Sequence, residues 1–522
     1  MILNPEQQAC ADAIDGVWVA ISGPGTGKTT TLVQRYLSML TRGIPARDIL
    51  NLTFTSAAAE TMVRKVGLLD ADEVFRTFHS FCMELLRKER ANLPFPLCET
   101  VIPVGMEDFK LLFELVRRYP GIKNFNELKD RLSNWKRMNL NPTDALNQAQ
   151  GNEYFYALAY RDYERECREQ GWLDFDSVMQ ETKSLLETNA EVRARWQRPY
   201  IAVDECQDTD VVQFRILQLL FNGNIFVVGD ENQLIYEWRS AQSGNLTNFA
   251  QKFPGAQTLY IGKNYRSTKR LVEFFKAILP VDNGIASRMV TDNEEGVDPV
   301  FKKYSDEHEE AYWVLAQITD PENTAILART NRQLFIYHRI CTMRSIKYKI
   351  LGKKDFFDQN EVRKLLTYAK EVDSNQPAAR VLKDLIEQHR MLEVYKHSVT
   401  KDSNPIENLN NVVTLAGTKG GTIKEFIEYL RKRSHGRKSA KGLTLSTVHQ
   451  SKGREWRNVF IVGAEQGRMP HKDGEIKEEA RIFYVAATRA ADFLHISYSG
   501  HHSMFLEPFK DKIQNLSNSE AL

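Results

Sequence analysis

The chain has 522 residues with a formal net charge of +2, and 42% of its residues are hydrophobic while 26% are charged. This length is too great for one hydrophobic core, so we expect roughly two to four globular domains. No apolar run approaches the ~20 residues that a membrane helix needs. The first residues also lack the basic and then apolar pattern of a secretory signal. We therefore expect a cytoplasmic protein without a membrane partner.

A glycine-rich loop lies between a predicted strand and a predicted helix near the N-terminus. An apolar run at 17–22 predicts the strand, Gly23-Pro24-Gly25-Thr26-Gly27-Lys28-Thr29-Thr30 follows, and residues 31–37 have helical apolar spacing. Backbone N–H groups of such a loop, with the helix N-terminus, bind phosphate oxygens. Lys28 would reach the β- and γ-phosphates, and the Thr29 hydroxyl would bind Mg²⁺. By itself, the loop indicates binding of a nucleoside triphosphate.

Polar groups also follow two further predicted strands. Asp204 and Glu205 come directly after an apolar run at 200–203, which suits Mg²⁺-assisted hydrolysis at the carboxyl edge of a sheet. Asp204 would hold the metal, and Glu205 would accept the proton of the attacking water. The next strand, at 224–230, leads to Gln233, which could sense the γ-phosphate.

Aromatic and basic segments occur at intervals along the rest of the chain. They include Tyr236 and Trp238, which could either stack on bases or pack in a core. The motif segments are 3–8, 23–30, 52–59, 77–80, 203–209, 228–239, 264–267, 443–456 and 479–490. In this order they resemble the motifs of superfamily 1A DNA helicases, the UvrD/Rep/PcrA group, from the Q motif to motif VI. The resemblance covers nearly the whole chain.

The resemblance implies roles for individual residues. ATP and Mg²⁺ are the implied cofactors, and the implied metal ligands are Thr29 and Asp204. The implied nucleotide-binding residues are Gln7, Gly23, Gly25, Thr26, Gly27, Lys28, Thr29, Thr30, Tyr265 and Glu455. Catalysis is assigned to Lys28, Glu205, Gln233, Arg266 and the arginine finger Arg489. DNA contacts are assigned to Phe54, Thr55, Thr77, His79, Tyr236, Trp238 and His449.

The same resemblance implies an α/β fold with two RecA-like P-loop lobes, each a parallel sheet flanked by helices. We expect lobe 1A at 1–85 and 196–255, and a helical insertion 1B at 86–195. Lobe 2A is expected at 256–375 and 443–507, followed by a tail at 508–522. The segment 376–442 is a reduced form of the family's domain 2B, and we expect a polar loop at 401–411 within it.

The resemblance implies an ATP-dependent helicase that moves 3′-to-5′ on single-stranded DNA. ATP bound between the two lobes would close them, and hydrolysis would open them, so that each cycle produces a step. We expect single-stranded DNA and junctions with duplex DNA as ligands. A protein partner such as a nuclease or a repair or replication factor is also expected. The alternative is a DNA-stimulated motor or sensing subunit of a larger nuclease or anti-phage complex, with weak unwinding alone.

Overall fold

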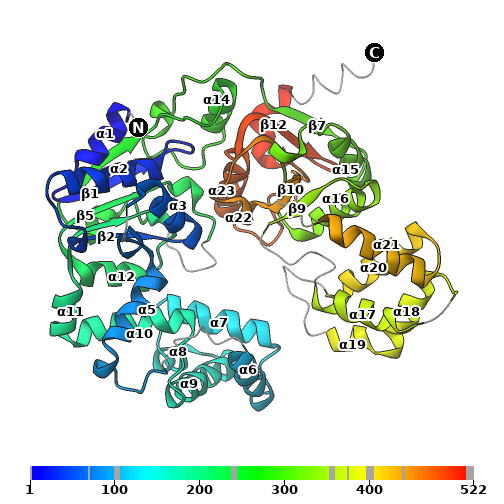
Figure 1. The fold of residues 1–522 in the computed structure, drawn as a ribbon, viewed down its shortest axis with the longest axis horizontal. Helices are drawn as coiled ribbons and strands as arrows, with labels where there is room; N and C mark the ends of the chain where they lie inside the picture. Colours follow the sequence, from blue (N-terminus) through cyan, green and yellow to red (C-terminus); the bar gives the residue numbers. More distant parts are fainter. Residues whose placement is uncertain are drawn as a thin grey trace. The chain divides into compact units, whose positions relative to one another are not determined.

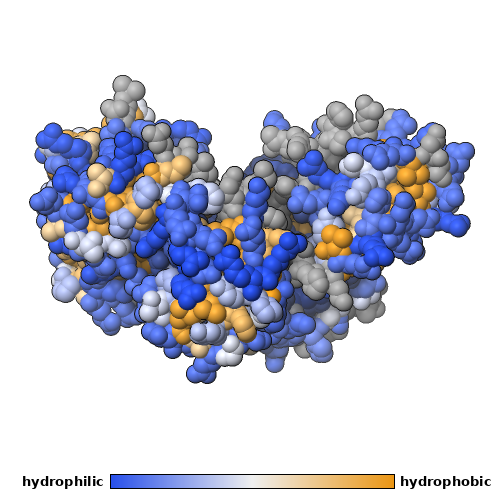
Figure 2. All heavy atoms as spheres, turned by 90° about the horizontal axis from the view of Figure 1, so that it is seen from below, coloured by the Kyte–Doolittle hydropathy of each residue, from blue (hydrophilic) through white to orange (hydrophobic). Residues whose placement is uncertain are grey.

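The computed structural model describes residues 3–68, 71–98, 106–236, 244–351, 359–372, 375–395, 405–437 and 441–512. It divides into two compact units, one formed by Met1–Tyr265 with Val281–Val290 and the other by Arg266–Pro280 with Thr291–Leu522. Each unit contains a six-stranded parallel sheet flanked by helices (Figure 1), which confirms the predicted α/β class. Hydrophilic residues predominate on the face in Figure 2, and no described helix is both long and apolar enough to cross a membrane.

The sheet of the first unit positions the glycine-rich loop. Its strand order is β3 (Phe75–Thr77), β2 (Ile49–Thr53), β4 (Arg198–Val203), β5 (Phe221–Gly229), β1 (Val17–Ser22) and β6 (Gln257–Ile261). Strand β1 is parallel to both neighbours, with Val19 opposite Val227 and Thr258. Because the central strands are covered on both faces, β1, β4 and β5 each contain a continuous apolar run, such as 225–228 in β5. The polar residues after β1, β4 and β5 therefore meet at one edge of the sheet.

Helices cover both faces of this sheet and form two cores. One face is packed by α1 (Pro5–Asp12), α2 (Lys28–Thr41), α3 (Ser56–Val66) and α4 (Ala71–Val74). The other is packed by α5 (Phe78–Lys88), α10 (Phe175–Thr188), α11 (Ala190–Trp196), α12 (Val211–Leu220) and α13 (Phe249–Lys252). Side chains alternate between the two cores along the strands of the sheet interior, as Ile49 and Leu52 do in β2.

The inserted helices of the first unit share a core that is built from a shorter segment than the predicted 86–195. Helices α6 (Met106–Arg118), α7 (Phe125–Arg137), α8 (Pro142–Gln148) and α9 (Glu153–Glu169) share it. The expected insertion 86–195 was too long, because Val178 and Leu186 of α10 and Val192 of α11 pack in the core of the sheet. Their helical spacing alone did not show which apolar core they would join.

The second unit has its own sheet, of strand order β7 (Val300–Lys303), β12 (Ala490–Tyr498), β11 (Trp456–Ile461), β8 (Thr324–Ala328), β10 (Leu443–Thr447) and β9 (Tyr348–Ile350). Its main helices are α14 (Lys269–Ala277), α15 (Glu307–Ala316), α16 (Asn331–Arg344), α22 (Val448–Ser451) and α23 (Ile476–Ala487). A short 3₁₀ segment, Met504–Phe509, follows β12 near the end of the described residues.

A separate helical group belongs to the second unit (Figure 1). It contains α17 (Asn360–Lys370), α18 (Ala378–Gln388), α19 (Met391–Tyr395), α20 (Pro405–Lys419) and α21 (Ile423–Arg437), around one apolar core. The polar loop expected at 401–411 was wrong from residue 405 onward, because α20 begins there. Its buried residues Leu409, Val412, Val413 and Ala416 have helical spacing and pack in this core.

The boundary that we expected after residue 255 was also wrong. Strand β6 is an edge strand of the first sheet, with Ile261 opposite Ser22. The chain crosses to the second unit only after Tyr265, and 281–290 returns to the first unit, where the Val290 carbonyl accepts a hydrogen bond from the Asn264 N–H. A strand that pairs with β1, far away in sequence, leaves no local sign of which sheet it joins.

Candidate nucleotide and DNA sites

The loop between β1 and α2 has the backbone of a phosphate cradle. Gly25 and Gly27 have φ angles of +67° and +79°, where a side chain would be strained. Ser22 stands where the strict motif has glycine, and its hydroxyl donates to the Gly229 carbonyl at 2.8 Å, which ties β1 to β5. The Thr26 hydroxyl donates to the Gly23 carbonyl at 3.0 Å, so the loop also closes on itself.

Residues predicted to contact adenine gather on one side of this loop. The Gln7 amide donates to the Thr26 carbonyl at 2.9 Å, and the Tyr265 N–H donates to the Gly25 carbonyl at 2.9 Å. Asn4 links the two, because its side chain caps α1 at the Gln7 N–H while its amide donates to the Tyr265 hydroxyl at 2.8 Å. Tyr265 is 48% exposed, which leaves its ring accessible to a ligand.

A lysine and two carboxylates meet at the edge of the first sheet. Lys28 Nζ lies 3.9 Å from Glu205 Oε1, and the Asp204 N–H is bonded to the Leu52 carbonyl of β2. Burial, followed by the charge of Glu205, raises the pKa of Asp204 to about 7, against the opposing charge of Lys28. Two adjacent acids held in this way favour a bound cation.

Glutamine side chains fix the orientation of these acids. Gln207 Nε2 donates to Glu205 Oε2 at 2.5 Å, and Gln207 Oε1 accepts from the Asp230 N–H at 3.0 Å. Gln233 Nε2 donates to Asp230 Oδ2 at 2.8 Å. Burial raises the pKa of Asp230, while Lys28 lowers it. The predicted sensor Gln233 is thus linked to Glu205 through Asp230 and Gln207.

The oxygen groups at this edge fit a hard divalent cation. No group of three or more His, Cys, Asp or Glu side chains that could hold a metal occurs in the described ranges. A metal here would therefore need phosphate or water oxygens beside the Asp204 carboxylate and the half-buried Thr29. This mixed set is the usual way in which Mg²⁺ is bound in nucleotide sites.

The predicted arginines and Glu455 come together in the second unit. Arg266 donates through Nε to Glu455 Oε2 at 2.6 Å and through Nη1 to the Thr488 carbonyl at 2.8 Å. Arg489, only 2% exposed, donates through Nε to the Val485 carbonyl at 2.9 Å and through Nη2 to the Thr488 hydroxyl at 3.1 Å. Both guanidinium groups are therefore anchored on the turn that follows α23.

Three of the residues predicted to contact DNA, Phe54, His79 and Tyr236, lie in two aromatic pairs of the first unit. The Phe54 and Tyr236 rings are stacked, with centroids 5.8 Å apart and planes at 21°. The His79 ring meets the Phe175 ring edge-on at 5.4 Å, and burial lowers the pKa of His79. Phe175 is 52% exposed, so this second pair reaches the surface.

The remaining predicted DNA residues have other surroundings. The Thr55 hydroxyl accepts from the Ala58 N–H and caps α3, and the Thr77 hydroxyl accepts from the Ser80 N–H and caps α5. His449 is half-buried on α22 of the second unit. Trp238 lies outside the described residues.

Comparison with known families decides the identity of this architecture. The model of the UvrD/REP helicase N-terminal domain matches residues 3–254, and that of the UvrD-like helicase C-terminal domain matches 259–411 and 380–501. The chain belongs to the UvrD/REP helicase family. The first match ends three residues before β6, and the second begins within β6. Together they cover the glycine-rich loop, both acids and the two arginines.

Two relatives of this UvrD/REP helicase are both named ATP-dependent DNA helicase PcrA. The protein of Staphylococcus epidermidis is 26% identical over 614 residues, which cover 96% of this chain and 84% of the relative. That of Staphylococcus aureus is 26% identical over 617 residues, covering 97% and 84%. Both alignments are longer than the 522 residues of the helicase, so the relatives contain segments without a counterpart here.

Several residues of the helicase site were missed in the sequence. Gln207 and Asp230 lie inside recognised motifs, but their side-chain links depend on the order of β4 and β5. Asn4 could have been found, because Asn4 and Gln7 have the spacing of a capping box. Lys65 of α3 donates to the Thr30 hydroxyl at 3.1 Å, and no local pattern indicated this contact.

Proposed function

We propose that this UvrD/REP helicase moves 3′-to-5′ along single-stranded DNA and couples ATP hydrolysis to strand separation. The observation that carries the proposal is the approach of Lys28 to Glu205, 3.9 Å apart at the carboxyl edge of a parallel sheet. A phosphate cradle beside a buried acid pair suits phosphoryl transfer to water. The family matches and the names of the PcrA relatives support DNA as the substrate.

The groups of the first unit would carry the hydrolysis. Thr29 and Asp204 would hold Mg²⁺, which supplies charge to phosphate oxygens when bound. Lys28 would neutralise the β- and γ-phosphates, and Glu205 would take a proton from the attacking water. Gln207 and Gln233 keep the acids oriented, as their hydrogen bonds indicate. The phosphate-loop residues Gly23, Gly25, Thr26, Gly27 and Thr30, with Gln7 and Tyr265, would bind the rest of ATP.

The second unit would contribute the remaining charge. We assign Arg266 and Arg489 to the γ-phosphate of the same nucleotide and Glu455 to its ribose. Stabilising charge that develops on transferred phosphate is the main catalytic task in this chemistry. Arg266 and Arg489 both donate hydrogen bonds to Thr488. Replacing one arginine would therefore change the surroundings of the other through Thr488. A cycle of nucleotide binding and release would then drive stepping.

Bases of the strand would stack on the aromatic pairs. The Phe54–Tyr236 stack and the exposed Phe175 beside His79 offer ring faces, and base stacking on aromatic side chains is tolerant of sequence. We propose that Thr55, Thr77, Trp238 and His449 contact the same strand. Junctions with duplex DNA would be the place of unwinding.

A second candidate is a translocase or sensing subunit that unwinds poorly without a partner such as a nuclease, a repair or replication factor or an anti-phage component. The small helical group α17–α21 and the longer alignments of the relatives favour this candidate. Family members place a larger accessory domain at this position. A smaller domain offers less surface for duplex DNA.

The experiment is ATP hydrolysis with and without single-stranded DNA, together with strand separation on duplexes that carry a 3′ or a 5′ tail. Stimulation by DNA with unwinding from the 3′ tail is expected. Stimulation without unwinding would favour the second candidate. Unwinding only from the 5′ tail would contradict the proposed polarity, and a lack of DNA stimulation would contradict the motor.

A further inference from the structure

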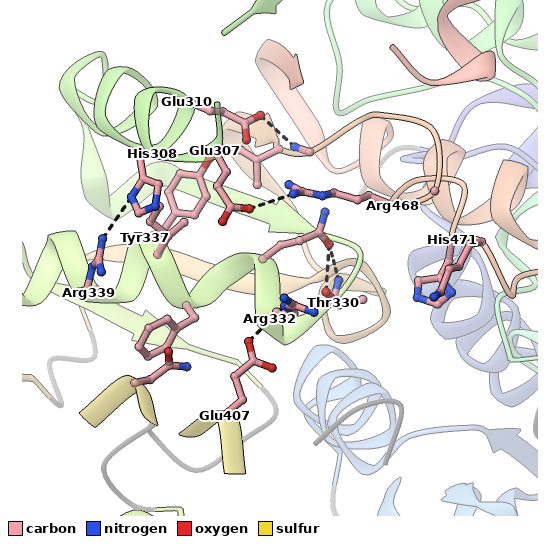
Figure 3. Close-up of a pocket in the computed structure, with 18 residues that line it drawn as sticks. Glu307, His308, Glu310, Thr330, Arg332, Tyr337, Arg339, Glu407, Arg468 and His471 are labelled. Atoms are coloured by element: carbon pink, nitrogen blue, oxygen red, sulfur yellow. Dashed lines mark hydrogen bonds and ion pairs between the residues drawn. The ribbon is translucent and has the colours of Figure 1, made fainter. Parts of the chain in front are cut away.

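A polar pocket of about 500 Å³ lies in the second unit (Figure 3). Its walls come from the first turn of α15, from α16, from the loop after β11 and from α20 of the helical group. In the part of the chain that the structure describes, its lining includes none of the residues assigned above to ATP or DNA. A volume of this size can hold a ligand as large as a nucleotide.

The charges on the pocket walls favour an anionic ligand. The cationic side chains are Arg332, Arg339, Arg468 and Lys472, and the carboxylates are Glu307, Glu310 and Glu407. Arg468 is 3.0 Å from Glu307, and Arg332 is 3.2 Å from Glu407 (Figure 3). Burial raises the pKa of Glu310, which disfavours its charged form. Arg468 also pairs with Glu465 at 2.8 Å, whereas Arg339 and Lys472 pair with no carboxylate among the described ion pairs. The charge of these two side chains would attract phosphate.

Three residues that line the pocket each have a donor atom that is buried without a hydrogen-bond partner among the described residues. These atoms are the hydroxyl of Tyr337, Nε2 of Gln333 and Nε of Arg339. Tyr337 is only 1% exposed. A buried donor that lacks a partner costs about 1–3 kcal/mol, so such groups call for a further partner. Because all three can donate, that partner would present acceptor oxygens or ring nitrogens.

The other walls suit a base. Phe335 presents an aromatic ring from α16, and Asn411 presents an amide from α20. Rings stack on bases of any sequence, and amides can bond to base edges. The residues that line this one pocket thus include cations, donors without a partner among the described residues, and an aromatic ring.

We propose that this pocket binds a nucleotide through its phosphate and base, at a second site separate from that of ATP. The nucleotide is either free in solution or one unit of a nucleic-acid strand, since both present the same groups. Glu407 and Asn411 belong to α20 while the other walls belong to the lobe. A bound nucleotide therefore stabilises the packing of the helical group on the lobe.

Binding to two fluorescent probes tests this proposal. The probes are thymidine 5′-monophosphate and a dT oligonucleotide, measured by anisotropy with the full chain carrying Lys28→Ala. The pocket variant adds Tyr337→Phe and Arg339→Gln, which remove two donors with little change in volume. The matched control adds Arg344→Gln, also on α16, whose guanidinium lies 4.3 Å from the Tyr312 ring and outside the pocket. Thermal unfolding checks that both chains are folded.

The expected result is binding about tenfold weaker in the pocket variant than in the control, the size of one charge-assisted hydrogen bond. Weaker binding of the monophosphate identifies a free nucleotide as the ligand. Weakening confined to the oligonucleotide identifies a unit of a strand. Equal binding of both probes by the pocket variant and the control overturns the proposal.

Discussion

Arg266 and Glu455 form a direct ion pair, in which Arg266 Nε donates to Glu455 Oε2 at 2.6 Å. We assign the arginine to the γ-phosphate and the glutamate to the ribose. Under these assignments neither side chain can contact the nucleotide fully while it bonds its partner, so we expect the pair to open when ATP binds. The Glu455 side chain is 62% exposed and that of Arg266 is 14% exposed, so the Glu455 side chain can change its rotamer more easily than that of Arg266.

Replacing Glu455 by glutamine tests this relationship. We expect the KM for ATP to rise several-fold with kcat nearly unchanged, because the weaker bond of the neutral amide to the ribose outweighs the release of Arg266 and acts equally in the ground and transition states. Steady-state ATP hydrolysis with saturating DNA measures both constants. Asp492→Asn is the matched control, since Asp492 pairs with Arg457 on the surface at 2.7 Å. Unchanged values of both constants would show that Glu455 does not contact the nucleotide.

Glu205→Gln tests the general base. We expect kcat for ATP to fall by ~10²–10⁴, because the neutral amide cannot take the proton of the attacking water. DNA affinity should stay within about twofold of the original, as measured by anisotropy with a dT oligonucleotide. Lys28→Ala should abolish turnover in the same way by removing phosphate charge. Unchanged turnover in either variant would show that the chemistry occurs elsewhere.

The Phe54–Tyr236 stack gives a prediction about DNA affinity. Removing either ring should weaken binding of single-stranded DNA by ~1–3 kcal/mol, roughly 5- to 150-fold, because one base loses its stacking surface. Phe54→Ala, Tyr236→Ala and the double variant form a double-mutant cycle. Titrations with a labelled dT oligonucleotide measure the three affinities, and Phe113→Ala, an exposed phenylalanine of α6, is the control. Three unchanged affinities would exclude the stack from the DNA path.

His495 makes the stability of the second unit depend on pH. It lies in β12, 1% exposed, and burial, assisted by the charge of Lys302, lowers its pKa from 6.5 to about 4. Between these values the unfolded chain binds the proton and the folded chain does not. The free energy of unfolding should therefore fall as the pH drops from 6.5 to 4, in total by an amount on the order of 3 kcal/mol.

Thermal unfolding between pH 7 and pH 4 measures this dependence. His495→Phe should flatten it, because the substituted phenyl ring can keep the edge-on contact that His495 makes with Phe460 but does not titrate. His501→Gln changes an exposed histidine and should leave the dependence as it is. An identical pH profile for the chain with and without His495→Phe would contradict the role of this residue.

The sequence by itself determined the local parts of this protein. The order of apolar run, glycine loop and helix placed Lys28 and Thr29 at the start of α2, since each of these signals lies within a few residues. The apolar run before Asp204 likewise marked the end of β4. These patterns work because a buried parallel strand must be continuously apolar and a phosphate loop must be small and flexible.

Only the tertiary structure decided which distant segments meet. Gln207 connects Glu205 to Asp230, β6 forms an edge of the first sheet, and α20 begins within an expected loop. All three features depend on packing between segments far apart in sequence. The pocket beside Tyr337 is built from four such segments. Local propensity carries no information about these partners, because their contacts form only when the sheets and cores are complete.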